Sequence, residues 1–346
     1  VMNNDNTKGE SATSESMSRK EILSRRKLLG QLGAVAGGAG VLAACGQSPS
    51  ATAETTEAEA APQLDINLQD PSESLKHFTR IFGDTNVDNV TTGWFEGTVY
   101  SVIGDSSQVT PLLGLEGVGI MRVQPVDTER GPGYRVFNRE LAFYKDLRTG
   151  KFVDEWTNPL NGKLVETFPM HNMTVNAETA PILKFDVEGT EISIPFPASW
   201  RTVGPYVFST FEIHTSVPSE LQPEEWPMES PGPMTRISEM FQRTVNMSDL
   251  RNPELTSIPY TGTWTRLSSW YPWMLMGQAE GNLYFRANMA KLSGPEEIPA
   301  AFVEKANEKH AAYLEPPSLD SWGQPNDSTY NTYERERSPQ PVDGDS

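Results

Sequence analysis

The sequence predicts a mainly β protein: an antiparallel, up-and-down, calycin-like β-barrel with a few peripheral helices. Residues 134–176 contain three strand-like runs joined by two turns of the same construction, at residues 146–151 and 158–163. Each turn opens with Asp or Asn and carries a Gly that tolerates the positive φ of a tight turn. Turn signals recur roughly every 8–12 residues, which is typical of a barrel or sandwich rather than of βαβ units. Closing about ten such strands into a barrel also removes the exposed edges of the sheet.

Alternation and turn signals place the remaining elements. A helix is expected at residues 71–80 with Ser72 as its N-cap, and a closing helix at residues 298–314. A third, short amphipathic helix is expected at residues 234–245, where apolar residues recur at helical spacing. Further strands are expected at residues 93–103, 116–123, 182–187, 191–195, 200–203, 206–216, 261–267 and 282–290.

The first 44 residues are predicted to be a signal peptide. Arg25 and Arg26 precede an uncharged run, residues 30–44, that is rich in Ala, Gly, Val and Leu. Paired arginines before a weakly apolar run indicate export by the twin-arginine translocase. The alternative is a short membrane helix, but the run is too short and too rich in glycine to span a bilayer.

A lipid anchor is predicted at Cys45, the single cysteine of the chain. It ends the sequence LAAC at residues 42–45, which is similar to a bacterial lipobox. Cleavage before Cys45 would give its thiol a diacylglycerol group, and a further acyl chain on the amine would make the anchoring stable. We therefore expect a lipoprotein on the periplasmic side of a bacterial membrane. The alternative is an unmodified free thiol.

Composition divides the chain into four segments and excludes one class of partner. We expect the signal peptide at residues 1–44, a disordered tether rich in Ala, Thr and Glu at 45–68, one barrel domain at 69–316 and an extended tail at 317–346. The formal net charge of −18 argues against binding to nucleic acid or to anionic lipid.

Candidate site residues follow from the alternation of side chains along the strands. If the polar and aromatic faces of the strands point into the barrel, six side chains converge there: Tyr100, Arg122, Glu140, His171, Glu212 and His214. A histidine and a carboxylate from this set would form an acid–base pair. The alternatives are a cross-strand ion pair of Glu140 with Arg122 or Arg139 on the outside, and histidines that are only structural.

A second group of residues is predicted to contact a ligand. Residues 270–277 form the densest cluster of aromatic and sulfur side chains, and Trp273 and Met276 would line an apolar wall or a lid. Arg266 and Arg139 join Tyr100 and Arg122 as polar ligand contacts. His171, His214 and the two glutamates are acceptable metal-ligand types, but they lack the close histidine spacing of a prearranged site, so neither a metal nor a cofactor is predicted.

Several ordered motifs together resemble a known family. They include Trp94-Phe-Glu-Gly97, Trp156-Thr-Asn-Pro159 and Trp273-Met-Leu-Met-Gly277, together with Arg139-Glu-Leu141 and Tyr144-Lys-Asp146. On these residues the chain resembles the domain of unknown function 1838 family, found in bacteria and fungi and often exported. The resemblance covers roughly residues 70–315. It implies the domain boundaries and a shared site, and it implies no particular chemistry.

Two functions are compatible with these predictions. The first is an exported, lipid-anchored barrel that binds an apolar or aromatic small molecule. The second is a cofactor-independent isomerase, lyase or hydrolase that uses His171 or His214 with Glu140 or Glu212 in the barrel lumen. The sequence contains no G-x-S-x-G, P-loop, G-x-G-x-x-G or H-E-x-x-H motif, which argues against serine hydrolases, nucleotide binding and zinc proteases.

Overall fold

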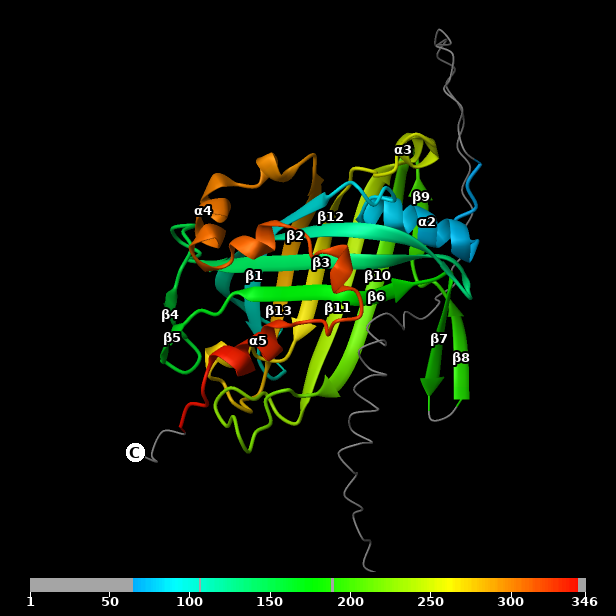
Figure 1. Cartoon of the computed structure of the whole chain (residues 1–346). Coiled ribbons are helices and arrows are strands. Elements are labelled where there is room, and N and C mark those ends of the chain that lie inside the picture. The colour runs from blue at the N-terminus through cyan, green and yellow to red at the C-terminus, as the bar shows by residue number, and fades with distance from the viewer. Residues whose placement is uncertain (1–64, 106, 188–189, 342–346) are drawn as a thin grey trace, which may run out of the picture.

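The computed structural model describes residues 65–105, 107–187 and 190–341, so the predicted signal peptide, Cys45 and most of the predicted tether lie outside the described residues. The described chain is mainly β: nine antiparallel strands form one sheet that curls into a half-barrel (Figure 1). Two small two-stranded ladders, β4–β5 and β7–β8, extend from it.

The main sheet has the order β6-β3-β2-β1-β13-β12-β11-β10-β9. Its strands are β1 (Thr91–Val102), β2 (Val109–Thr128), β3 (Gly131–Lys145), β6 (Met170–Thr179), β9 (Ser199–Val203), β10 (Tyr206–Pro218), β11 (Met234–Asn246), β12 (Thr261–Ser268) and β13 (Asn282–Leu292). The ladders are β4 (Glu155–Thr157) with β5 (Leu164–Glu166), and β7 (Ile182–Val187) with β8 (Thr190–Pro195). The helices are α2 (Pro71–Phe82), α3 (Met247–Arg251), α4 (Ala300–Lys309) and α5 (Thr329–Glu336), with short 3₁₀ turns η1 (Pro272–Met274), η2 (Pro295–Glu297), η3 (Ala311–Leu314) and η4 (Leu319–Ser321).

The strands connect as in an up-and-down sheet. With the exception of β6 and β9, strands of the main sheet that follow each other in the sequence pair, and the first strand, β1, also pairs with the last, β13. The sheet opens at one place, between β6 and β9, which are its two edges. In the described chain no hydrogen-bonded ladder joins β6 to β9, so the sheet does not close into a full barrel. The β7–β8 hairpin lies between these two strands in the sequence.

Both predicted turns are confirmed, and they are built alike. In the first, the amide of Gly150 donates to the carbonyl of Asp146 at 2.8 Å, and in the second Gly162 donates to Asn158 at 2.7 Å. Gly150 and Gly162 adopt positive φ of 69° and 73°, the conformation for which glycine is favoured. Between the two turns the chain leaves the main sheet, since β4 and β5 pair only with each other.

Residues 234–245 form a strand and not the predicted amphipathic helix. β11 pairs along its length with β10 on one side and with β12 on the other. The ladders on both sides stabilise an extended chain more than the apolar spacing favours a helix, because tertiary pairing overrides weak local preference. The helix predicted at residues 71–80 is confirmed, but its N-cap is Asp70, whose side chain accepts from the amides of Ser72 and Glu73.

The two faces of the sheet are covered differently. Arg266 on β12 lies 4.0 Å from the sulfur of Met170 on β6, across the curl, which identifies the concave face. That face is filled by aromatic and aliphatic side chains, among them Tyr144, Trp264 and Phe285. On the convex face, Val118, Ile120, Leu141 and Phe143 pack beneath Phe302 of α4. α2 closes one end of the concave face, where the ring of Phe78 lies 5.0 Å from that of Phe196.

The C-terminal segment contributes to the core, which corrects the prediction of an extended tail. Tyr330 and Tyr333 of α5 are buried in the concave core. Asp327 forms an isolated β-bridge with Met173 of β6, and Asn326 accepts from the amide of Val175 at 2.9 Å. Residues 326–333 therefore pack along the β6 edge of the opening.

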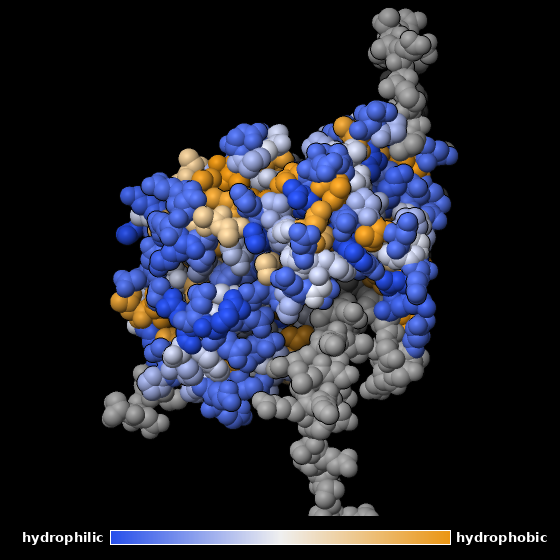
Figure 2. Space-filling view, in the orientation of Figure 1, coloured by the Kyte–Doolittle hydropathy of each residue, from blue (hydrophilic) through white to orange (hydrophobic). Residues whose placement is uncertain are grey.

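The surface in view in Figure 2 is mostly hydrophilic, with hydrophobic residues in scattered patches. Within the described ranges, no helix has both the length and the apolar character needed to cross a membrane.

Candidate functional site

His171 and Glu140 lie on opposite faces of the sheet, so their predicted shared site is wrong. Glu140 pairs across the β3–β6 ladder with Asn172, whose Nδ2 donates to its carboxylate at 3.2 Å on the concave face. His171 pairs with Leu141 on the convex face, and its ring lies 5.9 Å from that of His310. The prediction fails because β4 and β5 leave the main sheet, so the alternation counted from them does not continue into β6.

The surroundings of His171 are those of a structural residue and not of a catalytic one. Its side chain is buried, and Nδ1 lies 2.9 Å from the carbonyl oxygen of Pro169. Burial lowers the pKa of His171 below its ordinary value. The neutral imidazole therefore packs with His310 and Tyr313 as part of the convex layer.

Glu212 and His214 do meet, but on the outside of the half-barrel. His214 Nε2 lies 3.2 Å from Glu212 Oε2, and both side chains are half-exposed. They are opposite Ser238 and Met240, whereas Glu239 between these two points to the concave face. The pair is thus separated from the interior by the sheet itself.

Three other predicted residues also lie on the convex face. The ring of Tyr100 lies 6.0 Å from that of Tyr284, and Arg122 is opposite Phe137 in the β2–β3 ladder. Arg139 donates to the carbonyl of Ala312 at 2.7 Å and so fastens the segment after α4. The assumption that polar and aromatic faces point inward is therefore wrong for β1 and β2, whereas on β3 the face that carries Glu140 does point inward.

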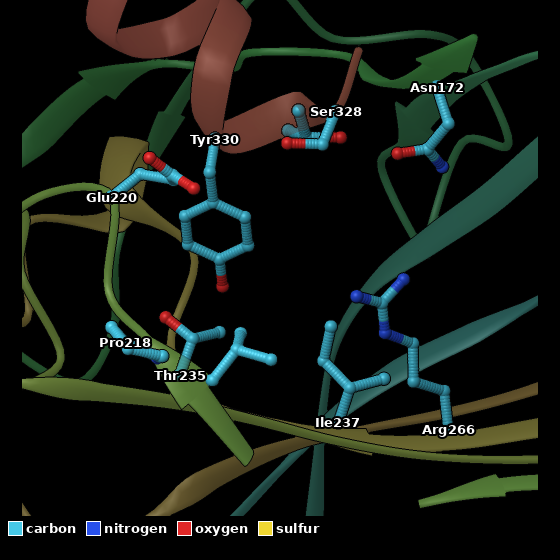
Figure 3. Close-up of a pocket in the computed structure, with 10 residues that line it drawn as sticks. Asn172, Pro218, Glu220, Thr235, Ile237, Arg266, Ser328 and Tyr330 are labelled. Atoms are coloured by element: carbon cyan, nitrogen blue, oxygen red, sulfur yellow. The ribbon is translucent and has the colours of Figure 1, made fainter. Parts of the chain in front are cut away.

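The concave face instead gathers a cluster around Arg266, here called the Arg266 cluster. Its members come from five parts of the fold: Glu140 and Tyr144 from β3, Glu239 from β11, Arg266 from β12, Tyr271 from the loop after β12, and Tyr330 from α5. Arg266 and Glu140 were predicted as site residues. Figure 3 shows the Arg266 guanidinium facing Asn172 and the Tyr330 ring across an open space.

Arg266 is held by an ion pair and by aromatic rings. Its Nη1 lies 3.7 Å from Glu239 Oε1, and the Trp264 indole donates to the same oxygen at 3.1 Å. The guanidinium carbon lies 5.7 Å from the centre of the Tyr271 ring. Although burial opposes the charge, interactions with Tyr271 and Glu239 raise the pKa of Arg266, so the guanidinium is a fixed positive charge.

Burial and neighbouring charge set the protonation of the other members. Burial raises the pKa of Glu140, and the nearby Glu239 carboxylate raises it further, against the hydrogen bond from Asn172. Burial also raises the pKa values of Tyr144, Tyr271 and Tyr330. The three phenols are therefore protonated donors, and Glu140 is a carboxyl group that takes up a proton more readily than usual.

The region also contains polar atoms that lack partners. Within the described part of the chain, three buried side-chain atoms near the cluster form no hydrogen bond: Asn138 Oδ1, Arg266 Nε and Tyr271 Oη. Tyr144 Oη and Trp273 Nε1 have only each other as hydrogen-bond partners. A buried polar atom without a partner costs about 1–3 kcal/mol, so native structures rarely leave several together. Their concentration indicates a place where water or a ligand supplies the missing partners.

A cavity of about 190 Å³ adjoins the Arg266 cluster (Figure 3). It lies between α5 and the strands β10 to β12, beside β6. Apolar and hydroxyl groups form most of its wall, Arg266 and Asn172 supply nitrogen donors, and Glu220 supplies a carboxyl group. The lining residues are Asn172, Val217, Pro218, Glu220, Thr235, Ile237, Arg266, Ser328, Thr329 and Tyr330.

The predicted aromatic loop, residues 270–277, packs against Tyr144 of the Arg266 cluster, and none of its residues lines this cavity. Trp273 is buried against Tyr144, with ring centroids 4.9 Å apart. Asn158 of the β4–β5 turn donates to the carbonyl of Met274 at 2.9 Å, and its Nδ2 lies 3.3 Å from the sulfur of Met276. Leu275 between them has φ of 51°, a left-handed conformation rare for leucine, so the turn holds a strained loop in place.

The described residues contain no group of three or more His, Cys, Asp or Glu side chains placed to hold a metal ion.

The sequence did not identify Glu239, Tyr271 and Tyr330 as site residues. Glu239 was hidden by the helix prediction for β11, and Tyr330 by the tail prediction. Tyr271 lies in the aromatic loop at residues 270–277, two residues before Trp273, and this position could have identified it as a site residue.

Comparison with protein families gives one match. The model of the family described as "Protein of unknown function (DUF1838)" matches residues 88–337, a range that includes all nine strands of the main sheet, the Arg266 cluster and α5. Among curated proteins, none matches the chain.

Proposed function

This chain belongs to the DUF1838 family, and we propose that it binds a small, neutral, mainly apolar molecule through one carbonyl or hydroxyl oxygen. The ligand occupies the cavity beside the Arg266 cluster. The observation that carries this proposal is that Arg266, which lines the cavity, has a buried Nε without a hydrogen-bond partner in the described chain, with the unpartnered hydroxyl of Tyr271 on the ring beside its guanidinium. A ligand oxygen would satisfy some of these atoms, and the apolar wall would take the rest of the ligand.

The charges of the site favour a neutral ligand. Glu140 and Glu239 place two carboxyl groups beside one guanidinium, and Arg266 is already paired with Glu239. An anion would lose its hydration and meet a second carboxylate, which is unfavourable in a buried site. A carbonyl oxygen accepts from Arg266 or a phenol without adding charge.

The volume sets the size of the ligand. A dry cavity of about 150 Å³ in another protein is known to admit benzene, whereas drug-sized ligands occupy roughly 300–1,000 Å³. At about 190 Å³ the present cavity suits one aromatic ring with a small substituent. This agrees with the apolar or aromatic ligand expected from the sequence.

The cellular setting is part of the same proposal. Export by the twin-arginine route is supported by Arg25 and Arg26 before an uncharged run, and lipid anchoring by the position of Cys45. The half-barrel would then act at the periplasmic face of a bacterial membrane, with a calycin-like use of its interior. The strand order, in which only the β6–β9 step is open, supports the comparison with such barrels.

Three isosteric probes test the binding proposal: acetophenone, its hydrocarbon analogue isopropylbenzene, and benzoate. Calorimetry should rank acetophenone first, because only it combines an apolar ring with a neutral oxygen acceptor. Ile237→Phe, which fills the cavity wall, should abolish the heat of binding. Ile192→Phe, a change at an exposed position on β8, should leave it intact. Equal affinity of both variants, or preference for benzoate, would refute the proposal.

A second test uses protein purified from its own host. Native mass spectrometry of the wild-type chain should show a retained small molecule that is absent from Ile237→Phe. Retention of the same mass by both variants would place the ligand elsewhere.

A further inference from the structure

We propose that the Arg266 cluster is a catalytic site for proton transfer at the carbon next to a ligand carbonyl, with Glu140 as the base and Arg266 as the oxygen-binding cation. The inference rests on the proposed ligand cavity and goes beyond it, because binding alone requires no base. It also replaces the histidine-based pair expected from the sequence. All four histidines lie in described residues, and His171 and His214 are on the convex face.

Glu140 is partly accessible and lies next to the cavity wall, behind the lining residue Asn172. Asn172, which lines the cavity, donates to Glu140 Oε2 at 3.2 Å and so fixes the carboxylate beside the cavity wall. On the β2 side Glu140 is opposite Gly119, where a Cβ would be in ordinary contact with Glu140 Cγ at 3.6 Å, so glycine leaves about a methyl group of room there.

The basicity of Glu140 suits this task. An ordinary carboxylate is a weak base at neutral pH, and enzymes strengthen such groups by burial and by a neighbouring like charge. Both effects act here, from the enclosing core and from Glu239. The Asn172 hydrogen bond opposes them only in part and at the same time holds the carboxylate in one orientation.

Arg266 and the phenols are suited to the oxygen that gains charge. Arg266 Nε and Tyr271 Oη are buried, and in the described chain they have no hydrogen-bond partner. The Arg266 guanidinium keeps its charge, and the phenol of Tyr271 keeps its proton. Donors fixed in place before the reaction stabilise a developing oxyanion without reorganisation, which is the largest contribution in many such sites.

The step balances without any further reactant. The bond from hydrogen to the carbon next to the carbonyl breaks, and the proton passes to the Glu140 carboxylate. The electron pair forms a carbon–carbon double bond, and the carbonyl oxygen becomes an enolate held by Arg266, which lines the cavity. Glu140 then returns the proton to the same carbon, or to a conjugated one, which gives exchange or isomerisation. No oxidation state changes, so neither an oxidant nor a reductant is required.

Deuterium uptake tests this step directly. Acetophenone is incubated with the full chain in D₂O, and ¹H NMR follows loss of the methyl signal. We expect the protein to accelerate the exchange over buffer. Glu140→Gln should reduce that acceleration by about 100-fold or more, the range of general base catalysis. Glu212→Gln removes a carboxylate on the convex face and should leave the rate unchanged.

Binding measurements on the same variants separate the two proposals. Calorimetry should show that Glu140→Gln still binds acetophenone, because the amide keeps the shape of the side chain. If the wild type binds the ketone but does not exchange its protons, the catalytic inference is wrong and the binding proposal stands. If the wild type does not bind the ketone, the binding proposal itself fails.

A third variant, Glu140→Asp, distinguishes the loss of the base from a failure to fold. Glu140→Asp keeps the charge but withdraws the carboxylate, so it should fold and exchange more slowly than the wild type. Its rate should still rise with pH as the carboxyl group ionises, whereas the rate of Glu140→Gln should not. An unchanged exchange rate in both variants would overturn the role of Glu140.

Discussion

Two buried arginines lie on neighbouring strands of the half-barrel, and their surroundings differ. Arg266 on β12 is paired with Glu239 and borders a cavity. Arg243 on β11 lies 5.3–5.4 Å from the centres of four aromatic rings, and within the described chain it has no ion pair. The four rings are those of Phe78, Phe82, Phe241 and Tyr260.

The difference shows two ways to bury a cation. Aromatic faces stabilise a guanidinium without a counter-charge, and they also close the space around it, so Arg243 joins α2 to the sheet. A carboxylate stabilises the charge more strongly but must itself be kept solvated or paired. The Arg266 end therefore borders a cavity, whereas at the Arg243 end aromatic rings surround the guanidinium, whose Nε and Nη1 also lack hydrogen-bond partners in the described chain.

The largest expected effect comes from removing the cation of the ion pair. Arg266→Met leaves the Glu239 carboxylate largely buried without its partner, which costs about 3–5 kcal/mol in comparable pairs. We expect the lower part of that range, since Glu239 keeps some solvent contact, measured as the free energy of unfolding in urea. The double variant Arg266→Met, Glu239→Met should recover most of the loss. No recovery would mean that the pair is not the source of the effect.

Acid should weaken the α2 end, through His77. This imidazole is fully buried, accepts from Arg80 at Nδ1 over 3.0 Å and contacts Glu73 through Nε2 at 3.2 Å. Burial, and then the charge of Arg80, lower the pKa of His77 to about 4. Between pH 6.5 and 4 the unfolded chain takes up a proton that the folded protein does not, so stability falls as the pH is lowered.

A pKa lowered from 6.5 to about 4 corresponds to roughly 3.5 kcal/mol at about 1.4 kcal/mol per pKa unit, and because solvent relaxation reduces this value, we expect a loss of about 2 kcal/mol near pH 4. His77→Gln keeps the polar contacts without titrating and should flatten this part of the pH profile in urea unfolding. The matched variant His214→Gln, at a half-exposed position, should not. An unchanged slope in His77→Gln would contradict the assignment.

The same substitution at the other arginine should have a smaller effect. Arg243→Met removes the cation–π contacts but leaves no carboxylate unpaired, and methionine packs well against aromatic rings. We expect a loss of about 1 kcal/mol in urea unfolding, well below that of Arg266→Met. Acetophenone binding should persist in Arg243→Met. A loss equal to that at Arg266 would erase the distinction between the two ends.

The smallest expected effect is on the pH dependence of stability at the Arg266 end, where stability should fall as the pH rises, the opposite of the effect of His77. The pKa of Glu140 is raised by burial and by Glu239, so the folded protein holds this proton to higher pH than the unfolded chain. Stability should therefore decline as the pH rises from the ordinary glutamate value through the raised one. Glu140→Gln should remove this decline in a thermal-melting series, and a persistent decline would assign it to another group.

Local features of this fold were predictable, whereas features set by distant pairing were not. The turns at Asp146 and Asn158 depend on residues within the turn, so they were predicted correctly. The face shared by Glu140 and Tyr144 follows from alternation within one strand. The face of His171 does not, because the chain leaves the sheet before β6. Glu239 and Tyr330 were missed because β11 is extended only through its two neighbours, and because α5 gains its burial from the β6 edge.

The pairing of β1 with β13 has a consequence for how the chain folds during synthesis. Residues 91–102 remain without one neighbour until residues 282–292 have been made. The core is complete only when Tyr330 and Tyr333 have followed. Such long-range closure is slow and exposes apolar strand edges while it is pending. For a chain exported through the twin-arginine route, as proposed, this waiting period falls in the cytoplasm, where chaperones would have to shield β1 until the last strand arrives.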